Sequence, residues 1–435
     1  MEKPVYYAPT DYGDYAFSVA AAAVKFGAGV LVELGGDAKS LGLKRVALFM
    51  DPKVRNTEPA AVAEKSLKEA GVDYVIYDEI KIEPTDRSFM EAAAFATEGN
   101  FDGFVSLGGG STMDTAKAAN LYSTHPADFL AYVNLPYGEF RPAPGPLKPH
   151  IACPTTSGTG SETTSTAVMD IVDLKVKTAI SQKLMKPTLA LIDPTTAESM
   201  PAGVVAATGF DVLTHAIESY TARPYTTRAR PATPDQRPVF QGANPYSDTS
   251  SLHAISLGGK YLVRAVKDPD DLEARHMLML AATTAGLSFG NAGVHLPHAM
   301  SYGVAGLCHT LVADGYENDN PMVPHGIACI LNAPAAFRFC APACPERHLE
   351  AAAALGADVR NADPEHGGKL LTDKLIEMMR ETGLPNGTGA LGFTEDDIPE
   401  LTKRGYNQPR LLILAPREVT EQDVADMYRD GLKYW

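Results

Sequence analysis

FDGFVSLGGGSTMDTAKAANLY, residues 101–122, passes from an apolar run through three glycines into a stretch with helical character. We interpret it as a β-strand, a tight turn and an α-helix. Gly108, Gly109 and Gly110 would let a ligand approach the backbone closely, because glycine has no Cβ. Free N–H groups at the start of the helix would then favour a phosphate or pyrophosphate. A tight turn without a ligand accounts for the pattern equally well.

This turn differs from two well-known phosphate-binding patterns. Met113 stands where the third glycine of GxGxxG would be, and no Gly-Lys-Ser/Thr follows as in a P-loop. Ser111 or Thr112 can cap the helix, and Asp114 suits its first turn. The motif therefore indicates where a ligand would bind without naming the ligand.

Short apolar runs and helical patterns alternate on both sides of the turn. Strands are predicted at 46–50, 73–78, 101–107, 150–155 and 188–193, and helices at 58–71 and 87–99. Such alternation is typical of a parallel sheet with helices on both faces. It predicts an α/β domain over residues 1–194.

After residue 194 strand patterns become scarce. Helical patterns cover 203–222, 247–267, 271–289, 326–340, 345–356, 367–382 and 421–433. They predict a second, all-α domain over residues 195–435. Residues 223–246, rich in proline, arginine and threonine, are expected to form a loop.

A second loop of the α/β domain carries many hydroxyl groups. PTTSGTGSETT, residues 154–164, follows a predicted strand directly and offers donors from Thr155, Thr156, Ser157 and Thr159. Ligands of open α/β folds bind at the carboxyl ends of the strands, so two such loops favour a nucleotide and a Rossmann-like domain. A solvated loop would look similar.

Asp51 ends another predicted strand of the same domain. Its carboxylate could accept a hydrogen bond from a ribose hydroxyl, as acidic residues do in dinucleotide-binding folds. An exposed aspartate in a turn is an equally simple explanation. Asp51 is therefore a candidate for cofactor binding.

Composition limits the possible partners and compartments. The chain has 435 residues, a net charge of −15 and five cysteines without a CxxC pair. An acidic protein of this kind is not expected to bind nucleic acid or anionic lipid, and no apolar run is long enough to span a membrane. The cysteines are expected to be reduced, and we expect a cytoplasmic protein. We also expect a homodimer or a larger homo-oligomer.

The helical half contains residues suited to binding a metal. In GFDVLTHAIESYTA, residues 209–222, Asp211 and His215 share one helical face. VHLPHAMSYG adds His295 and His298, and VPHGIACIL adds His325. One carboxylate and three imidazoles could hold Fe²⁺, Zn²⁺, Mn²⁺ or Co²⁺. Such a cation would favour the alkoxide form of an alcohol, which could lose hydride to a nicotinamide. Core histidines are the simpler alternative.

GGGSTMDTAK, PTTSGTGSE, GFDVLTHAIESY, HAMSYG and VPHG together resemble the iron-containing (group III) alcohol dehydrogenases over nearly the whole chain. The resemblance implies a dehydroquinate synthase-like architecture, with a dinucleotide-binding α/β half and a helical metal-binding half. It implies that Fe²⁺, or else Zn²⁺, is bound by Asp211, His215, His298 and His325. It implies NAD contacts from Asp51, Gly108, Gly109, Gly110, Ser111, Asp114, Thr155, Thr156, Thr159 and Lys177.

Within this family the likeness is greatest to hydroxyacid–oxoacid transhydrogenases. It is carried by EPTDRSFMEAAAFA, PLKPHIACPTTSGTGSETT, FGNAGVHLPHAMSY and PERHLEAAAALGAD. The resemblance implies oxidation of 4-hydroxybutyrate to succinic semialdehyde, coupled to reduction of 2-oxoglutarate to D-2-hydroxyglutarate on enzyme-held NAD. An NAD-dependent alcohol or 4-hydroxybutyrate dehydrogenase that releases NADH would carry much the same motifs. A dehydroquinate synthase-like lyase, which would share the architecture, and a non-catalytic binding protein also stay open.

One position departs from the family pattern. Many members carry a second histidine four residues after the third metal ligand, where this chain has Tyr302. A phenol is normally neutral at pH 7, so it can donate a hydrogen bond but is a poor base. We hypothesise that Tyr302 or His295 takes over part of the proton path. A core position is the alternative for His295.

A substrate that bears a carboxylate needs a cation. The loop at 223–246 offers Arg223, Arg228, Arg230 and Arg237, and arginine suits bidentate carboxylate binding. We hypothesise that at least one of them sets acid specificity. The alternative is a solvated loop or a contact between subunits.

Overall fold

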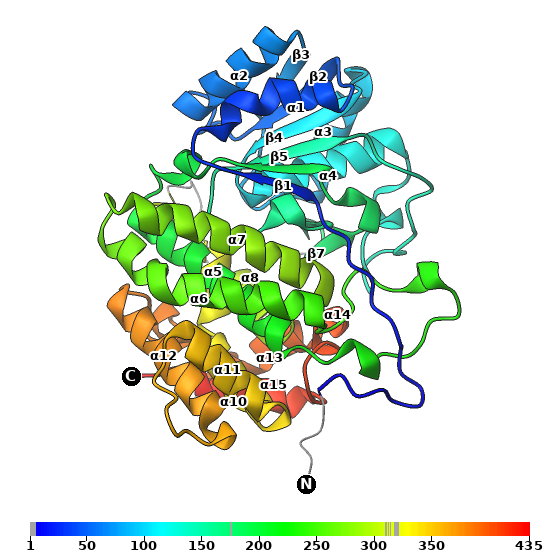
Figure 1. The fold of residues 1–435 in the computed structure, drawn as a ribbon. Helices are drawn as coiled ribbons and strands as arrows, with labels where there is room; N and C mark the ends of the chain where they lie inside the picture. Colours follow the sequence, from blue (N-terminus) through cyan, green and yellow to red (C-terminus); the bar gives the residue numbers. More distant parts are fainter. Residues whose placement is uncertain (1–5, 175, 309–310, 312, 314, 317–321) are drawn as a thin grey trace. The chain divides into compact units, whose positions relative to one another are not determined.

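The computed structural model describes residues 6–174, 176–308, 311, 313, 315–316 and 322–435. The chain divides into two compact units. One is Ala20–Ser199, and the other combines the described part of Met1–Val19 with Met200–Trp435. The first unit contains strands and helices, and the second is built of helices (Figure 1).

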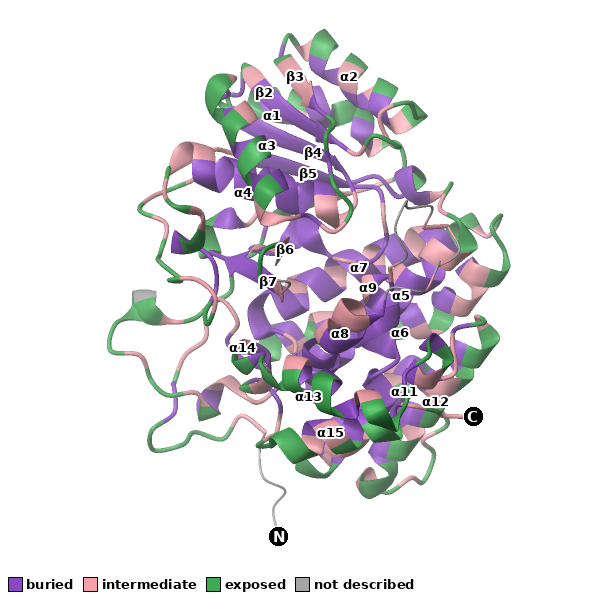
Figure 2. Ribbon diagram, turned by 180° about the vertical axis from the view of Figure 1, so that it is seen from behind, coloured by how far each residue is buried: buried purple, intermediate pink, exposed green. Residues whose placement is uncertain are grey.

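A parallel sheet forms the centre of the Ala20–Ser199 unit. Within the described residues it has six strands in the order β1-β8-β5-β4-β2-β3. The strands are β1 (Ala23–Phe26), β2 (Arg45–Met50), β3 (Asp73–Tyr77), β4 (Gly103–Gly108), β5 (His150–Pro154) and β8 (Leu189–Ile192). Strands β4 and β5 are buried along their whole length, as Figure 2 shows. Burial on both faces explains why their sequences are apolar without alternation.

Helices cover both faces of this sheet. They are α1 (Leu34–Ser40), α2 (Glu58–Ala70), α3 (Asp86–Glu98) and α4 (Gly110–Thr124). On β2, Val46, Leu48 and Met50 pack in one core with α1 and α2. Ala47 and Phe49 point to the opposite face and pack in another core with α3 and α4. The two-residue period of a strand thus gives each helix pair its own core.

The same unit contains an antiparallel hairpin. It consists of β6 (Thr166–Ile171) and β7 (Val176–Ser181), paired along their length. Ala167 and Met169 of β6 pack with Ala118 and Leu121 of α4 in a further apolar cluster. The pattern of the sequence did not predict this hairpin.

Helices make up the second unit. In the described chain they are α5 (Ala202–Thr221), α6 (Pro245–Lys267), α7 (Leu272–Ala292), α8 (Leu296–Leu307), α9 (His325–Ile330), α10 (Ala333–Cys340), α11 (Pro345–Leu355), α12 (Gly367–Glu381), α13 (Ile398–Tyr406), α14 (Pro409–Leu412) and α15 (Glu421–Asp430). Helix α5 packs against α6, α7 and α9, and it is buried at every residue from Gly209 to Thr221. It is therefore the central helix of the unit.

The first described residues, 6–19, pack with the helical unit, which differs from the predicted division at residue 194. The hydroxyl of Tyr6 donates to the carbonyl of Ala222, and Asp14 forms ion pairs with Arg228 and Arg237. These partners lie more than two hundred positions away, so no local pattern reveals them. The α/β unit accordingly begins at Ala20 and ends at Ser199.

Two further observations concern helices and cysteines. No single helix in the described chain has the length and composition of a membrane span, whereas α7 and α8 pass that test as a joined pair bent by 104°. All five cysteines lie within the described residues, are buried and form no disulfide.

Candidate metal centre and nucleotide-binding edge

Helix α5 presents Asp211, His215 and Glu218 on one face, because they are four and then three residues apart. Their exposed fractions are 2%, 5% and 0%. A buried charge is costly unless other groups compensate it. This face of the helix must therefore meet polar partners from other helices.

Asp211, His215, His298 and His325 supply ligand atoms that lie within 4.8 Å of one another. Oδ1 of Asp211 is 3.8 Å from Nε2 of His215. The same oxygen is 3.6 Å from Nε2 of His298 and 3.9 Å from Nε2 of His325. The structure thus brings together residues of α5, α8 and α9.

This geometry fits a divalent ion. Ligand atoms bound at about 2.1 Å with tetrahedral angles lie roughly 3.4 Å apart. Among the described residues, Oδ1 of Asp211 and Nε2 of His298 are buried without a hydrogen-bond partner. Buried polar atoms without partners are rare and costly. A cation between these atoms would satisfy both.

Protonation suits a metal at two of the four ligands, Asp211 and His215. Burial alone would raise the pKa of Asp211, but the imidazoles of His215, His325 and His298 outweigh it and hold that pKa well below its usual range. Burial lowers the pKa of His215 to about 3. An ionised carboxylate and a neutral imidazole are the forms that bind metals. Asp211 and His215 are therefore in those forms at neutral pH.

Glu218 fixes the orientation of His298, a role that the sequence reasoning missed. Its Oε1 accepts hydrogen bonds from the backbone N–H of His295 at 2.8 Å and of His298 at 3.3 Å. Its Oε2 pairs with Nδ1 of His298. An ionised carboxylate only accepts, so Nδ1 must carry a proton, and Nε2 is the ring nitrogen left for a metal. The spacing from Asp211 and His215 along α5 could have revealed this third polar residue.

Gly326 explains how His325 reaches α5. A Cβ at Gly326 would lie 1.9 Å from the carbonyl oxygen of Ala207, which is a backbone atom that cannot move aside. Helix α9 therefore lies against α5 as closely as glycine alone permits. His325, the first residue of α9, is thereby held 3.9 Å from Asp211.

The two residues predicted for proton transfer occupy different places. His295 is fully buried, and its Nε2 is 3.1 Å from the hydroxyl of Thr221. Burial lowers the pKa of His295 to about 4, so this imidazole is neutral at pH 7. Tyr302 is partly buried on α8, one turn after His298, and its hydroxyl accepts a hydrogen bond from Nη2 of Arg410 at 2.6 Å. Because Tyr302 is partly exposed and His295 is fully buried, a ligand can reach Tyr302 more easily than His295.

In the α/β unit, most predicted cofactor residues lie at one edge of the sheet. Asp51, the 108–111 turn and the 155–159 loop follow β2, β4 and β5, which are neighbours in the sheet. The backbone N–H of Thr155 donates to the carbonyl of Gly108 at 3.0 Å. A Cβ at Gly109 would lie 3.3 Å from Cγ2 of Thr156, so the two loops are adjacent. Open α/β sheets bind ligands at this edge.

Helix α4 begins at this edge without a side-chain cap. Its N-cap is Gly109, which has no side chain that could accept a hydrogen bond from the first turn. Ser111 and Thr112, the expected caps, lie inside the helix. The first N–H groups of the helix are therefore suited to an anionic group such as a phosphate.

Two of the three glycines are also required by the protein itself. A Cβ at Gly108 would lie 2.3 Å from Oγ1 of Thr112, and one at Gly110 would lie 2.7 Å from Cγ2 of Thr159. The Cβ of any other residue would overlap these side chains. Gly108 and Gly110 are therefore needed by the tight turn itself, which is the alternative that the sequence left open beside a ligand.

Asp114 and Lys177 have partners within the protein. Asp114 is buried, and its oxygens accept from the hydroxyl of Ser161 at 2.6 Å and the backbone N–H of Val168 at 2.9 Å. Lys177 lies on β7 and forms an ion pair with Glu83. The structure therefore gives these two residues internal contacts, and Lys177 lies beside Glu83, which follows the carboxyl end of β3.

The four arginines predicted to bind substrate also have internal partners. Arg228 and Arg237 pair with the buried carboxylate of Asp14. Arg230 donates to the carbonyl of Gly13 at 3.3 Å, and Arg223 donates to the carbonyl of Ala415 at 3.2 Å. These contacts attach the N-terminal segment and the 223–246 loop to each other and to the helical unit.

Asp14 is expected to make attachment of the N-terminal segment sensitive to acid. Burial alone would raise its pKa, but hydrogen bonds from Arg237 and Arg228 outweigh it and lower the pKa from 3.8 to about 2. A lowered pKa stabilises the folded form above pH 3.8, and the contribution is lost as the pH falls towards 2. Hydrogen exchange of residues 6–19 should therefore accelerate over this interval.

An Asp14→Asn variant should exchange these residues faster at pH 7 and lose the acid dependence. The exposed Asp11 gives a matched control, because Asp11→Asn leaves the arginine contacts intact. Equal protection of residues 6–19 in Asp14→Asn and wild type would show that the ion pairs do not hold the segment.

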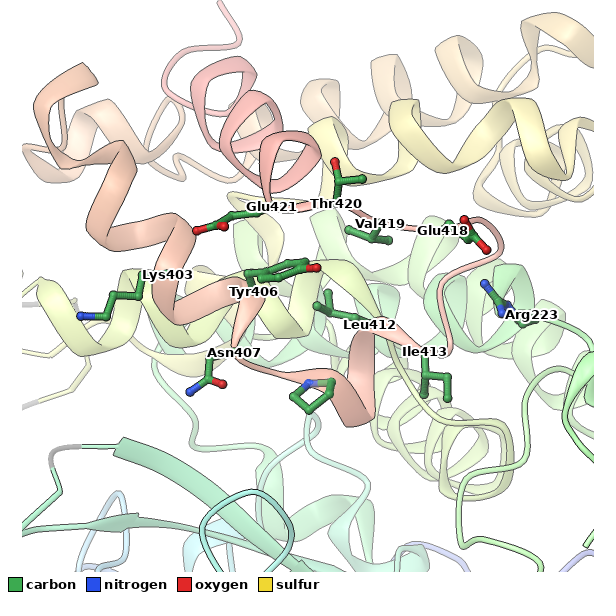
Figure 3. A pocket seen from close by; sticks show the side chains of 11 residues that line it. Arg223, Lys403, Tyr406, Asn407, Leu412, Ile413, Glu418, Val419, Thr420 and Glu421 are labelled. Carbon is green, nitrogen blue, oxygen red and sulfur yellow. The ribbon is translucent and has the colours of Figure 1, made fainter.

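A hollow of about 810 Å³ lies in the helical unit and is lined by α13, α14 and the segment 418–421. Figure 3 shows Arg223 and Glu418 on one side of it and Lys403 on the other. None of the four clustered ligand residues lines it. The hollow is therefore separate from the carboxylate–imidazole cluster. Arg223 lines this hollow.

A parallel α/β sheet with a nucleotide-type edge, together with a buried carboxylate–imidazole cluster, suits a metal-dependent enzyme with a nucleotide cofactor. Residues 21–194 match the family model for iron-containing alcohol dehydrogenase, and residues 239–432 match the model for the C-terminal domain of that family. The chain belongs to the iron-containing alcohol dehydrogenase family. It is an oxidoreductase that acts on CH–OH groups, with an iron-type metal and NAD as cofactors. The family, fold class and cofactors predicted from the sequence are confirmed.

Similar proteins include a hydroxyacid-oxoacid transhydrogenase and, among solved structures, an oxidoreductase and a reductase. The mitochondrial hydroxyacid-oxoacid transhydrogenase of Mus musculus is 49% identical over 97% of this chain and 91% of its own length. A crystal structure of 1,3-propanediol oxidoreductase superimposes with a TM-score of 0.83 at 27% identity, covering 96% of this chain and 100% of that one. Sulfoacetaldehyde reductase from Bifidobacterium kashiwanohense, in complex with NAD⁺, gives a TM-score of 0.79 at 25% identity, covering 96% and 99%.

The comparison corrects one prediction. The expected cytoplasmic location is contradicted, because the mouse relative is a mitochondrial enzyme. The prediction rested on the expectation that the cysteines are reduced. Reduced thiols separate oxidising from reducing compartments but do not tell one reducing compartment from another.

Proposed function

We propose that the chain is a hydroxyacid–oxoacid transhydrogenase that oxidises 4-hydroxybutyrate and reduces 2-oxoglutarate. The observation that carries the proposal is 49% identity over 424 residues with an enzyme of that name. The net reaction moves one hydride and one proton from the hydroxyl-bearing carbon and oxygen of one substrate to the carbonyl of the other. It produces succinic semialdehyde and D-2-hydroxyglutarate, and no cofactor is consumed.

Asp211, His215, His298 and His325 are the proposed metal ligands. When bound, the ion supplies Lewis acidity that favours loss of the proton from a substrate hydroxyl, and NAD supplies a hydride acceptor. One carboxylate offsets only part of a divalent charge, so this ligand set preserves that acidity. Glu218 keeps His298 in the tautomer that presents a lone pair.

Tyr302 is the proposed hydrogen-bond donor near the reacting oxygen. It shares the face of α8 with His298, and the bond from Arg410 uses its oxygen as an acceptor. Its own proton therefore remains to be donated. Fully buried His295, which contacts Thr221, is proposed to support the protein core.

The proposed NAD site is the carboxyl edge of β2, β4 and β5. The uncapped start of α4 at Gly109–Ser111 would face the pyrophosphate, and hydroxyls of Thr155, Thr156 and Thr159 would donate to it. Asp51 is partly exposed after β2 and would accept from a ribose hydroxyl. Asp114 and Lys177 are proposed to support this edge through their internal bonds. A homodimer or larger homo-oligomer stays a prediction.

The transhydrogenase is tested without added cofactor. Iron-loaded protein that retains NAD from purification is incubated with 4-hydroxybutyrate and 2-oxoglutarate, and 2-hydroxyglutarate is measured. Many molecules of 2-hydroxyglutarate per enzyme molecule are expected, because each oxidation of 4-hydroxybutyrate would reduce the retained NAD again for the next reduction of 2-oxoglutarate. Omission of either substrate is the control and should limit the yield to one turnover or none.

A dehydrogenase that exchanges its cofactor is the second candidate. The match to 1,3-propanediol oxidoreductase over 96% of the chain favours it. In that case 2-hydroxyglutarate would not accumulate without added NAD⁺. When NAD⁺ is added, free NADH would form in proportion to the 4-hydroxybutyrate that is oxidised. That result would reject the transhydrogenase.

A further inference from the structure

We propose that Arg410, together with Tyr302, binds the carboxylate of the substrate and sets the preference for hydroxy acids over simple alcohols. The inference rests on the proposed function, because it assumes an acidic substrate. It differs from the sequence-based hypothesis, which assigned this role to arginines of the 223–246 loop.

The first observation is position. Tyr302 follows His298 by four residues on α8, so the two side chains share one face. Arg410, in the short helix α14, reaches the hydroxyl of Tyr302 with Nη2 at 2.6 Å. Its Cζ lies 5.9 Å from the centre of the Tyr302 ring. The guanidinium is therefore fixed beside the helix face that carries a proposed metal ligand.

The second observation is unused hydrogen-bonding capacity. A guanidinium has five N–H donors, and the bond to Tyr302 uses one of them. No carboxylate of the described residues forms an ion pair with Arg410, which is partly exposed. The phenol accepts from Arg410 and still has its own proton to donate. The pair thus offers several donors and a positive charge to a planar anion.

The contrast with neighbouring arginines strengthens the inference. Arg228 and Arg237 are neutralised by Asp14, and Arg404, on nearby α13, is paired with Glu400 at 3.1 Å. A charge that is already compensated gains little from a substrate carboxylate. Arg410 has no such acidic partner in the described part of the chain.

The third observation is the spacing. One turn of α-helix, about 5.4 Å, separates His298 from Tyr302 along α8. An acyclic molecule whose hydroxyl- or carbonyl-bearing carbon is separated from a carboxylate by two CH₂ groups can span such a turn. 4-Hydroxybutyrate and 2-oxoglutarate share this pattern, so one site at Arg410 could serve both directions of the exchange.

Kinetics with paired substrates test this site. Arg410→Gln is compared with wild type on 4-hydroxybutyrate and on 1,4-butanediol, in which a CH₂OH group replaces the carboxylate. We expect KM for the acid to rise about 10- to 100-fold, as for loss of a hydrogen bond to a charged group, with KM and kcat for the diol nearly unchanged. Arg410→Lys should recover part of the loss. Arg404→Gln is the matched control and should leave both substrates unchanged.

A binding measurement gives a readout besides activity. Glutarate, which carries no reducible carbonyl, is titrated into the metal-loaded protein by calorimetry. Its Kd should rise at least tenfold in Arg410→Gln and less in Tyr302→Phe. Equal effects on acid and diol, or an unchanged Kd for glutarate, would overturn the role of Arg410. If the exchange without added cofactor fails but Arg410→Gln still affects the acid and not the diol, the transhydrogenase proposal is rejected and the role of Arg410 stands.

Discussion

Asp211→Ala is expected to lower turnover by about 10³-fold or more and to leave the purified protein without stoichiometric iron. The Lewis acid contributes several kcal/mol to the transition state, and each 1.36 kcal/mol is tenfold in rate. Asp211 supplies the one carboxylate of the cluster, and its Oδ1 is close to all three imidazole nitrogens. Metal analysis and assays on the same samples measure both quantities.

Two controls separate loss of the metal from loss of the fold. Chelator-treated wild type should lose activity to a similar degree and regain it when Fe²⁺ is added, whereas Asp211→Ala should not. Asp358→Ala removes an exposed aspartate paired with Arg360 at the surface and should change neither iron content nor rate. Full activity in metal-free Asp211→Ala would exclude the proposed chemistry.

Glu218→Gln is expected to weaken iron binding about 10- to 100-fold, which is the usual cost of removing a group that orients a metal ligand. The carboxylate accepts from Nδ1 of His298 and from the backbone N–H of His295. An amide of the same shape has only one acceptor oxygen, so one of these donors would face an NH₂ group. Competition with a chelator of known affinity measures the loss.

Glu350→Gln is the matched control for this prediction. Glu350 accepts from the hydroxyl of Tyr220, which also belongs to α5 but is not one of the clustered ligands. Its replacement should leave iron affinity unchanged. If Glu218→Gln binds iron as tightly as wild type, Glu218 does not orient His298.

The sequence predicted the local elements of the fold because their signals are local. The apolar run, three glycines and helical pattern of residues 101–122 correspond to β4 and α4. The four-residue spacing of Asp211 and His215 placed both on one face of α5. The long helical pattern at 326–340 was less exact, because α9 ends at Ile330 and α10 begins at Ala333.

Contacts between distant segments could not be predicted. The sequence predicted that an arginine of the 223–246 loop binds substrate, but Asp14, more than two hundred residues away, pairs with two of these arginines. Arg410 meets Tyr302 across 108 positions, so neither residue signals the other in the sequence. The spacing of Glu218 from Asp211 and His215 places it on their face of α5, but its contact with His298, 80 positions away, does not show in the sequence.

Anomalous diffraction at the iron absorption edge tests the central claim most directly. Crystals of iron-loaded protein should show one strong anomalous peak within bonding distance of Oδ1 of Asp211 and Nε2 of His215, His298 and His325. The absence of a peak at this cluster in catalytically active crystals, or a peak elsewhere in the chain, would contradict the account.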